Sequence, residues 1–298
     1  MNNTVNFDTV DSYNKYGGQT TMNPLVSIVD LSQGPLNCYT QLNVGLYIIV
    51  FKDKYCGEIE YGRSSYDYNE GALLFFSPGQ VIRLEETEEL HQPKGYALAF
   101  HPDFLHRTSL LKNFHEYTFF NYAMKEALYM SEKEQTDILD CFARIKSEIE
   151  RPIDQHSKRV IISAIELLLS YCIRFYDRQF ITREKMNYGI LERFEELVRN
   201  YYQSELPTDL GLPTVNYCAS ELFLSPNYFG DLIKKETGKT AHEYIQNTII
   251  NVAKNKVADP SKSLGEIAYE LGFKSPSHFS KLFKQKTGKT PNEYRMEV

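Results

Sequence analysis

A segment of 20 residues occurs twice near the C-terminus, and this repeat constrains the fold more than any other feature of the sequence. The first copy, SPNYFGDLIKKETGKTAHEY, begins at Ser225, and the second copy, SPSHFSKLFKQKTGKTPNEY, begins at Ser275. The two copies align without gaps and share 11 identical residues. One structural unit is therefore predicted to occur twice in the C-terminal third of the chain.

The repeat extends upstream, because TVNYCASEL from Thr214 matches SLGEIAYEL from Ser263 once a single residue is inserted before Ser275. Each copy of this unit of about 30 residues has the signals of a helix, a tight turn and a second helix. In the second copy Ile267 and Leu271 share one helical face, and Gly272 then interrupts the helix. The following helix is predicted to begin after Ser275 as N-cap, with Pro276 in its first turn, where a missing N–H is tolerated. This order is typical of a helix-turn-helix, whose second helix enters the major groove of DNA. A helical repeat that binds only protein is the alternative.

The charge of the whole chain disfavours a nucleic-acid partner, but its distribution does not. The chain has 33 basic and 39 acidic residues, a net charge of −6, whereas phosphate binding requires Lys and Arg. Residues 1–186 hold 19 basic and 25 acidic side chains, and residues 187–298 hold 14 of each, so the whole imbalance lies in the first part. Between Leu271 and Asn292 there are five lysines and no acid. The local charge therefore favours DNA as the partner of the second unit.

The stretch EIAYELGFKSPSHFSKLFKQKTGKTPNEYR, from Glu266 to Arg295, resembles the signature motif of the AraC/XylS family of bacterial transcription regulators. The resemblance implies a DNA-binding domain of seven helices at residues 187–298. Its parts would be a first helix-turn-helix at 214–237, a linker helix at 241–258 and a second helix-turn-helix at 264–287. Two recognition helices in one chain would read two adjacent half-sites of promoter DNA.

The first part of the chain predicts β structure. Residues 1–120 contain short apolar runs, rich in β-branched and aromatic residues, that are separated by Gly, Pro, Asn and Asp, as in an all-β sandwich or barrel. The stretch from Gly57 to Gln80 resembles the cupin-like effector or dimerisation domain of the same family. The arm before Pro24 is expected to be an unstructured tail, with a cover over the barrel mouth as the alternative. The predicted fold class is therefore α+β, a cupin-like β-barrel followed by helices.

Residues 121–186 show helical periodicity and are expected to pack on the barrel and to form a dimer interface. Ser131 and Glu134 have the spacing of a capping box, which satisfies free N–H groups at a helix start. A later apolar stripe has spacings of 4, 3 and 4 residues: Ile161, Ile165, Leu168 and Cys172. This stripe is either core or a dimer seam. A homodimer is expected through the helix at 131–150 or the helix at 156–178.

The position of each residue in the family motif implies the DNA contacts. Base contacts are expected at Asn227, Gly230, Asp231, Ser277, His278, Ser280 and Lys281. Phosphate contacts are expected at Ser225, Lys234, Lys235, Lys274, Ser275 and Lys284. Lys281 could donate to guanine, and Asn227 could pair with adenine. Asp231 can only accept, and pairing with a neighbouring lysine is its alternative; for His278 the alternative is a structural role.

No catalytic residue, metal site or cofactor is expected. The first part of the chain has five histidines but no H-x-H pair, namely His91, His101, His106, His115 and His156. No serine elbow, P-loop or H-E-x-x-H is present, which leaves a metal-dependent cupin enzyme as a remote alternative. The five cysteines form no C-x-x-C pair, and the chain contains neither a membrane-spanning apolar run nor a secretory signal at its start, so a cytoplasmic protein with reduced thiols is expected.

The expected function is transcription regulation. Promoter DNA, RNA polymerase and a second copy of the chain are the expected partners. Activation is the commoner role in the family that the chain resembles. A small molecule bound in the barrel is expected to control the regulator. The alternative is a barrel without ligand that serves only dimerisation or protein contact.

Overall fold

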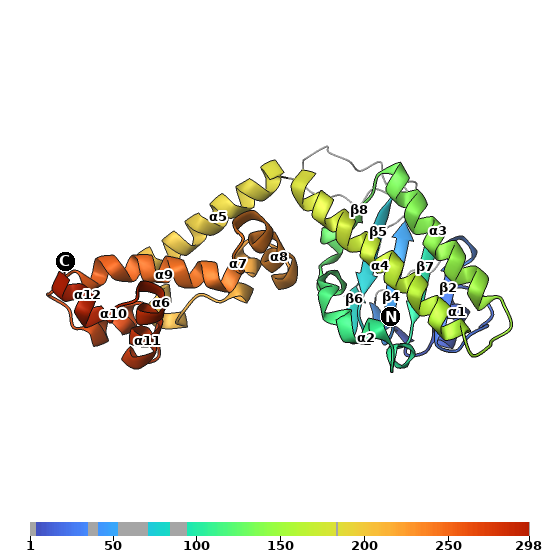
Figure 1. Cartoon of the computed structure of the whole chain (residues 1–298), viewed down its shortest axis with the longest axis horizontal. Coiled ribbons are helices and arrows are strands. Elements are labelled where there is room, and N and C mark those ends of the chain that lie inside the picture. Colours follow the sequence, from blue (N-terminus) through green and yellow to red (C-terminus); the bar gives the residue numbers. More distant parts are fainter. Residues whose placement is uncertain (1–3, 35–40, 53–70, 84–93, 183, 298) are drawn as a thin grey trace. The chain divides into compact units, whose positions relative to one another are not determined.

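The computed structural model describes residues 4–34, 41–52, 71–83, 94–182 and 184–297. It divides into two compact units, Met1–Thr182 and Arg183–Val298. The first unit contains two β-sheets and several helices, and the second unit is helical (Figure 1). The predicted α+β fold class is thus confirmed. Cys38, Cys56, His91 and most of the stretch 57–80 lie outside the described residues.

Two sheets form the N-terminal unit. The first has the order β1 (Thr4–Phe7), β3 (Gln41–Val44) and β6 (Gln80–Arg83), with β1 parallel to β3 and β3 antiparallel to β6. The second is antiparallel throughout, in the order β2 (Val26–Asp30), β7 (Gly95–Phe100), β4 (Tyr47–Lys52), β5 (Ala72–Phe76) and β8 (Leu128–Tyr129). In its centre Ile49 of β4 lies opposite Leu98 of β7 and Phe75 of β5, and all three are buried.

The N-terminal arm is part of this core, so the expectation of an unstructured tail is wrong. After β1, the arm forms α1 (Val10–Tyr16), which begins at a capping box between Thr9 and Ser12. Phe7, Val10 and Tyr13 are buried against the sheet strands, and the rings of Phe7 and Tyr13 meet edge to face at 5.0 Å. The free energy gained by burying these apolar side chains offsets the conformational entropy that the arm loses when it folds. Its strand and helix are only four and seven residues long, which is too short for a local sequence pattern to predict them.

Short helical turns cover the aromatic side of the large sheet. They are η2 (Pro102–Leu105), α2 (Ser109–Asn113), η3 (Phe114–Glu116), η4 (Thr118–Asn121) and η5 (Met124–Glu126). A further turn, η1 (Leu31–Gln33), follows β2, and its Leu31 packs with Phe7 and Val10 on the other face. The ring of Tyr47 lies 4.5 Å from that of Phe114 and 5.4 Å from that of Phe120, and Phe75 lies 4.5 Å from Phe119. These aromatic side chains pack on one another and form core.

Two long helices, α3 (Glu132–Ile149) and α4 (Ser157–Thr182), pack against each other, and α3 also packs on β2 while α4 packs on β8 (Figure 1). The capping box of Ser131 and Glu134 is confirmed at the start of α3. The stripe predicted as core or seam is buried within the unit: Ile161, Ile165, Leu168 and Cys172. It is therefore core, because α3 and the sheet occupy the space that a partner helix would need.

The C-terminal unit contains eight described helices, one more than the resemblance implies. They are α5 (Glu184–Gln203), α6 (Leu206–Leu210), α7 (Val215–Glu221), α8 (Pro226–Thr237), α9 (Ala241–Val257), α10 (Leu264–Glu270), α11 (Pro276–Thr287) and α12 (Pro291–Glu297). Its core includes Phe194, Phe229, Ile249, Phe279 and Phe283. Among the residues described, no helix combines the length and apolar character needed to cross a membrane.

Candidate nucleic-acid interface

The two copies of the repeat have the same local structure, a short helix, a turn and a 12-residue helix. In the first copy the Ser225 hydroxyl accepts a hydrogen bond from the backbone N–H of Tyr228 at 3.3 Å. In the second copy the Ser275 hydroxyl accepts from the N–H of His278 at 3.4 Å, and Pro276 lies in the first turn. The predicted N-cap is thus confirmed. Both serine hydroxyls serve the helix starts, so a phosphate near them would meet chiefly backbone N–H groups.

One face of each long helix is buried. On α8 the buried side chains are Tyr228, Phe229, Leu232 and Ile233, and on α11 they are Phe279, Leu282 and Phe283. Phe194 of α5 meets Phe229 edge to face at 4.9 Å, which holds the first unit on α5. The opposite faces of α8 and α11 are consequently the ones available to a partner.

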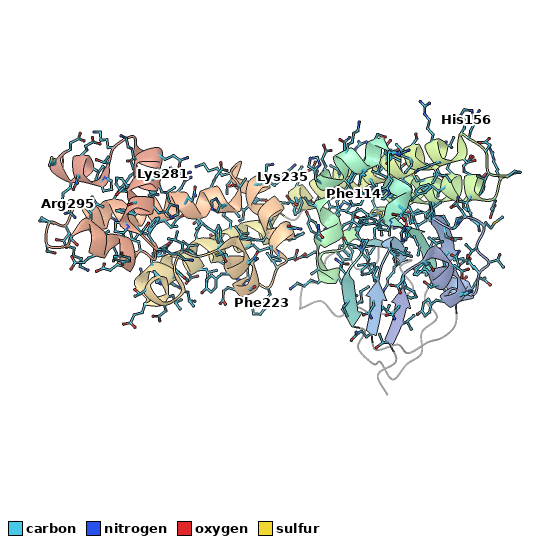
Figure 2. The ribbon with its side chains drawn as sticks, turned by 90° about the horizontal axis from the view of Figure 1, so that it is seen from below. Phe114, His156, Phe223, Lys235, Lys281 and Arg295 are labelled. Atoms are coloured by element: carbon cyan, nitrogen blue, oxygen red, sulfur yellow. The ribbon has the colours of Figure 1, made fainter. Side chains whose placement is uncertain are left out.

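The residues expected to contact DNA lie on these two helices or at their N-caps, except Lys274, which directly precedes the N-cap of α11. Those with exposed side chains are Asn227, Lys234, Lys235, Lys274, Ser277, His278, Lys281 and Lys284. Those that are partly buried are Ser225, Gly230, Asp231, Ser275 and Ser280. Figure 2 shows Lys235 and Lys281 along one side of the C-terminal unit and Phe223 on the opposite side. The two recognition elements therefore carry cations on a common side of one unit.

His278 also packs within its own unit. Its ring meets Phe273 edge to face, with the ring centroids 5.6 Å apart and the planes at 79°. Because the residue is still exposed, one edge of the imidazole stays available to a base or phosphate while the other contact fixes the ring. His278 thus has a structural contact with Phe273, and it is also exposed, as a DNA-contacting residue would be.

Several lysines in and before the second copy form ion pairs within the chain. Lys289 forms an ion pair with Glu297, so this cation is partly neutralised within the chain. Lys256 and Lys262 both pair with Glu270, at 2.8 and 2.5 Å, and these two ammonium groups hold the pKa of Glu270 below its ordinary value of 4.5. Glu270, at the end of α10, is therefore paired with two cations of the same chain.

The frame that positions the two recognition helices is built around α9 and α6. Helix α9 contacts α8 on one side and α10, α11 and α12 on the other. Gly272, in the turn of the second unit, approaches α6 so closely that a Cβ added there would lie 2.5 Å from the carbonyl carbon of Gly211 and 2.8 Å from the carbonyl oxygen of Pro207. The second helix-turn-helix is thus attached to the rest of the C-terminal unit at two places, along α9 and through this backbone contact with the α6 region.

Sequence reasoning missed two residues that shape the site. Arg295, the last residue of the motif, donates to the carbonyl oxygens of Val257 at 2.8 Å and Lys262 at 3.0 Å, and so ties α12 to the end of α9. Its place in the motif was the available signal. Phe223 lies in the turn of the first unit with φ +59° and is 73% exposed. The available signal was its alignment with Gly272, since a bulky residue rarely adopts this conformation.

Comparison with known proteins agrees with this arrangement. Residues 218–297 match the family model described as "Helix-turn-helix domain". Among solved structures the chain is similar to the C-terminal domain of AraT, a response regulator from Geobacillus stearothermophilus, at 25% identity over 37% of this chain and 85% of that chain, with a TM-score of 0.33. It is also similar to ToxT from Vibrio cholerae, at 13% identity over 86% and 88% of the two chains, with a TM-score of 0.31. No curated protein sequence matches the chain.

The TM-scores are low, so the assignment rests on the family match and on the paired, N-capped helices of the repeat. Both copies of the long helix, α8 and α11, fall inside the matched residues. Residues 218–297 are therefore a helix-turn-helix domain.

Proposed function

We propose that this chain regulates transcription by placing α8 and α11 in two successive segments of the major groove of promoter DNA. The observation that carries the proposal is the pair of equivalent helices, each buried on one face and polar on the other, on a shared frame. The 17 residues of α9 span about 26 Å, the same scale as the roughly 34 Å between successive major-groove segments. One chain would then read two unlike half-sites.

The two helices would contribute unequally. Helix α11 presents Ser277, His278 and Lys281 as exposed polar side chains, and Lys281 can donate to guanine O6 and N7. Helix α8 presents Asn227, but Gly230 has no side chain that could read a base. We expect α11 to supply more of the sequence readout, and the lysines of both helices to supply the phosphate attraction.

The finer parts of the proposal concern control. Activation through contact with RNA polymerase, homodimer formation and a small-molecule effector follow from the resemblance to AraC/XylS regulators. The cavity beside Phe75, Phe119 and Tyr176 has a volume of about 10 Å³, enough for one water molecule. An effector at that place would require the aromatic side chains to move. A barrel without ligand that serves only dimerisation fits so small a cavity equally well.

No observation on the described residues supports a catalytic function. Among the described residues no group of three or more His, Cys, Asp or Glu side chains could hold a metal ion. Asp103 lies 3.4 Å from His101 and 3.6 Å from His106, and its side chain is exposed. Regulation is therefore the function that the sites support best.

The test is DNA binding by the full chain to the DNA that flanks its own gene. We expect a footprint over two adjacent major-groove segments and an affinity that falls steeply with salt, because bound lysines release counterions. Lys281→Ala should weaken binding by about 5-fold to 100-fold and relax the preference at one position of one half-site. Lys133→Ala, which removes an exposed cation from α3, is the control and should leave the footprint unchanged. Salt-insensitive binding, or a folded Lys281→Ala variant with native specificity, would contradict the proposal.

A further inference from the structure

The two copies of the repeat hold their recognition helices in different ways. Tyr244 and Tyr294 are the aligned last residues of the copies. In the second copy the ring of Tyr294, on α12, packs directly on Phe283 of α11, with the ring centroids 5.5 Å apart. In the first copy the ring of Tyr244, on α9, lies 5.3 Å from that of Phe194 on α5, and Phe194 lies 4.9 Å from Phe229 of α8. A side chain of α5 therefore joins α9 to α8 in the first copy.

A hydrogen bond holds α5 on α9 at the same place. The Tyr244 hydroxyl donates to Oε1 of Glu195, the residue after Phe194. A carboxylate acceptor makes this bond stronger than one between neutral groups. Partial burial, followed by the bond to Glu195, raises the pKa of Tyr244 to about 12, so the hydroxyl remains a donor near neutral pH. One tyrosine thus contacts two successive residues of α5, one through its ring and one through its hydroxyl.

The two contacts constrain different motions of α5. Phe194 is fully buried, and apolar packing has no preferred direction, so its ring alone would let α5 turn or slide. Glu195 is exposed, and its bond to Tyr244 is directional, which fixes the rotation of α5 about its own axis. Helix α5 in turn contacts α8, and α9 contacts both α8 and α11 (Figure 1). A rotation of α5 would therefore displace α8 relative to α9.

We propose that Tyr244 and Glu195 are positioning residues for DNA recognition: their hydrogen bond holds α5 on α9 and so sets the place of α8 relative to α11. The carboxylate of Glu195 repels phosphate, so the pair acts through α8 and not on the DNA itself. The spacing of half-sites that the chain accepts is then fixed within the protein. This inference rests on the proposed function, because it requires two half-sites.

The experiment measures how strictly the full chain requires one half-site spacing. Its probes are the duplex that the wild-type chain protects beside its own gene and the same duplex with one base pair inserted between the half-sites. The insertion moves one half-site by about 3.4 Å and turns it by about 34°. We call the ratio of the two dissociation constants the spacing penalty and expect at least about 50-fold for the wild type. Tyr244→Phe should weaken binding to the native duplex about 5-fold and lower the spacing penalty about 10-fold, because α8 can then follow the displaced half-site.

Variants of Glu195 separate the hydrogen bond from the charge. Glu195→Ala removes the acceptor and should act like Tyr244→Phe, and the double variant should be no worse than either single one. Glu195→Gln keeps an acceptor oxygen and should keep the spacing penalty within about 2-fold of the wild type. Glu196→Ala is the matched control, since it removes the same charge from the adjacent exposed position of α5 and should leave the penalty unchanged. Circular dichroism shows whether each variant is folded.

The outcomes separate this inference from the proposed function. A wild-type chain that protects one segment or none overturns both. A wild-type chain that protects two segments, together with a folded Tyr244→Phe variant that keeps the full spacing penalty, overturns the positioning role and leaves the proposed function intact. Equal effects of Glu195→Gln and Glu195→Ala would assign the effect to charge, which also overturns the positioning role. A penalty that falls in Tyr244→Phe and Glu195→Ala but not in Glu195→Gln supports it.

Discussion

At the scale of single residues, the two copies of the repeat differ in the turn before the second helix. Gly272 adopts φ +86° in the second unit, and Phe223 adopts φ +59° at the aligned position of the first. A residue with a Cβ in this conformation costs roughly 1–2 kcal/mol. Phe223 is 73% exposed, so burial of its ring offsets little of that cost. The first helix-turn-helix therefore contains local backbone strain that the second helix-turn-helix avoids.

The variant Phe223→Gly should raise the free energy of unfolding of the C-terminal unit by about 0.5–1 kcal/mol. The gain is the released strain less the backbone entropy that glycine loses on folding. Urea unfolding followed by circular dichroism measures it. Phe223→Ala keeps the Cβ and therefore the strain, so it should show no gain; equal stabilisation by both variants would place the cause elsewhere.

Burial also determines the chemistry of single thiols. Removal from water raises the pKa of Cys141 to about 11 and that of Cys218 to about 12, and it raises the pKa of Cys172 as well. The thiolate is the reactive form, so these three side chains stay protonated near neutral pH. They are free and buried, and they act as small apolar residues of the core.

At the scale of elements, the placement of the second recognition helix depends on a contact between backbone segments. The turn that contains Gly272 lies against Gly211 and Pro207 of the α6 region. Because both partners are backbone, neither can rotate away as a side chain would. Only a residue without a Cβ fits between α10 and α6, so the relative orientation of α8 and α11 rests on one glycine as well as on α9.

Substitution of two glycines separates steric fit from backbone conformation. Gly272 and Gly288 have nearly the same φ, +86° and +81°, but a Cβ at Gly288 meets no atom within 4 Å. Both Ala variants should lose about 1 kcal/mol to the conformation, and Gly272→Ala should lose about 2 kcal/mol more to the clash. Thermal unfolding gives the difference. Equal losses would show that the α6 contact does not constrain the second unit.

At the scale of the whole molecule, the chain consists of two units with separate cores and different charge. Leu98 and Phe100 are fully buried in the first unit, and Phe194 and Phe229 are fully buried in the second. The excess of acid lies entirely in residues 1–186. Because the acidic excess lies in the N-terminal unit, the charge distribution favours the proposal that only the C-terminal unit contacts DNA.

Fragments 1–182 and 183–298 should each fold when produced alone, because each retains its own apolar core. The sum of their circular dichroism spectra should match that of the whole chain, and each should melt cooperatively. Only the second fragment should bind the promoter DNA, more weakly than the whole chain if dimer formation contributes. An unfolded second fragment would show that its stability depends on the first unit.

The sequence by itself determined those features that depend on neighbours within a few residues. The repeat predicts two helix-turn-helix units, and the capping residues Ser131 and Ser275 locate helix starts, because a cap bonds to an N–H three residues away. The class α+β follows from the same local patterns. These interactions form within a single turn of the chain, and that is why they can be read without a structure.

Only the tertiary structure decided which of the competing faces is buried. The sequence could not tell whether the stripe of Ile161 is core or seam. Burial against α3 and the sheet shows that it is core, while Val160 and Leu167 of the same helix are exposed. The same holds for Phe7 in the folded arm and for Gly272 against Gly211. Each depends on segments that are distant in sequence, and their contact energy is set by the packing of the whole unit rather than by any local propensity.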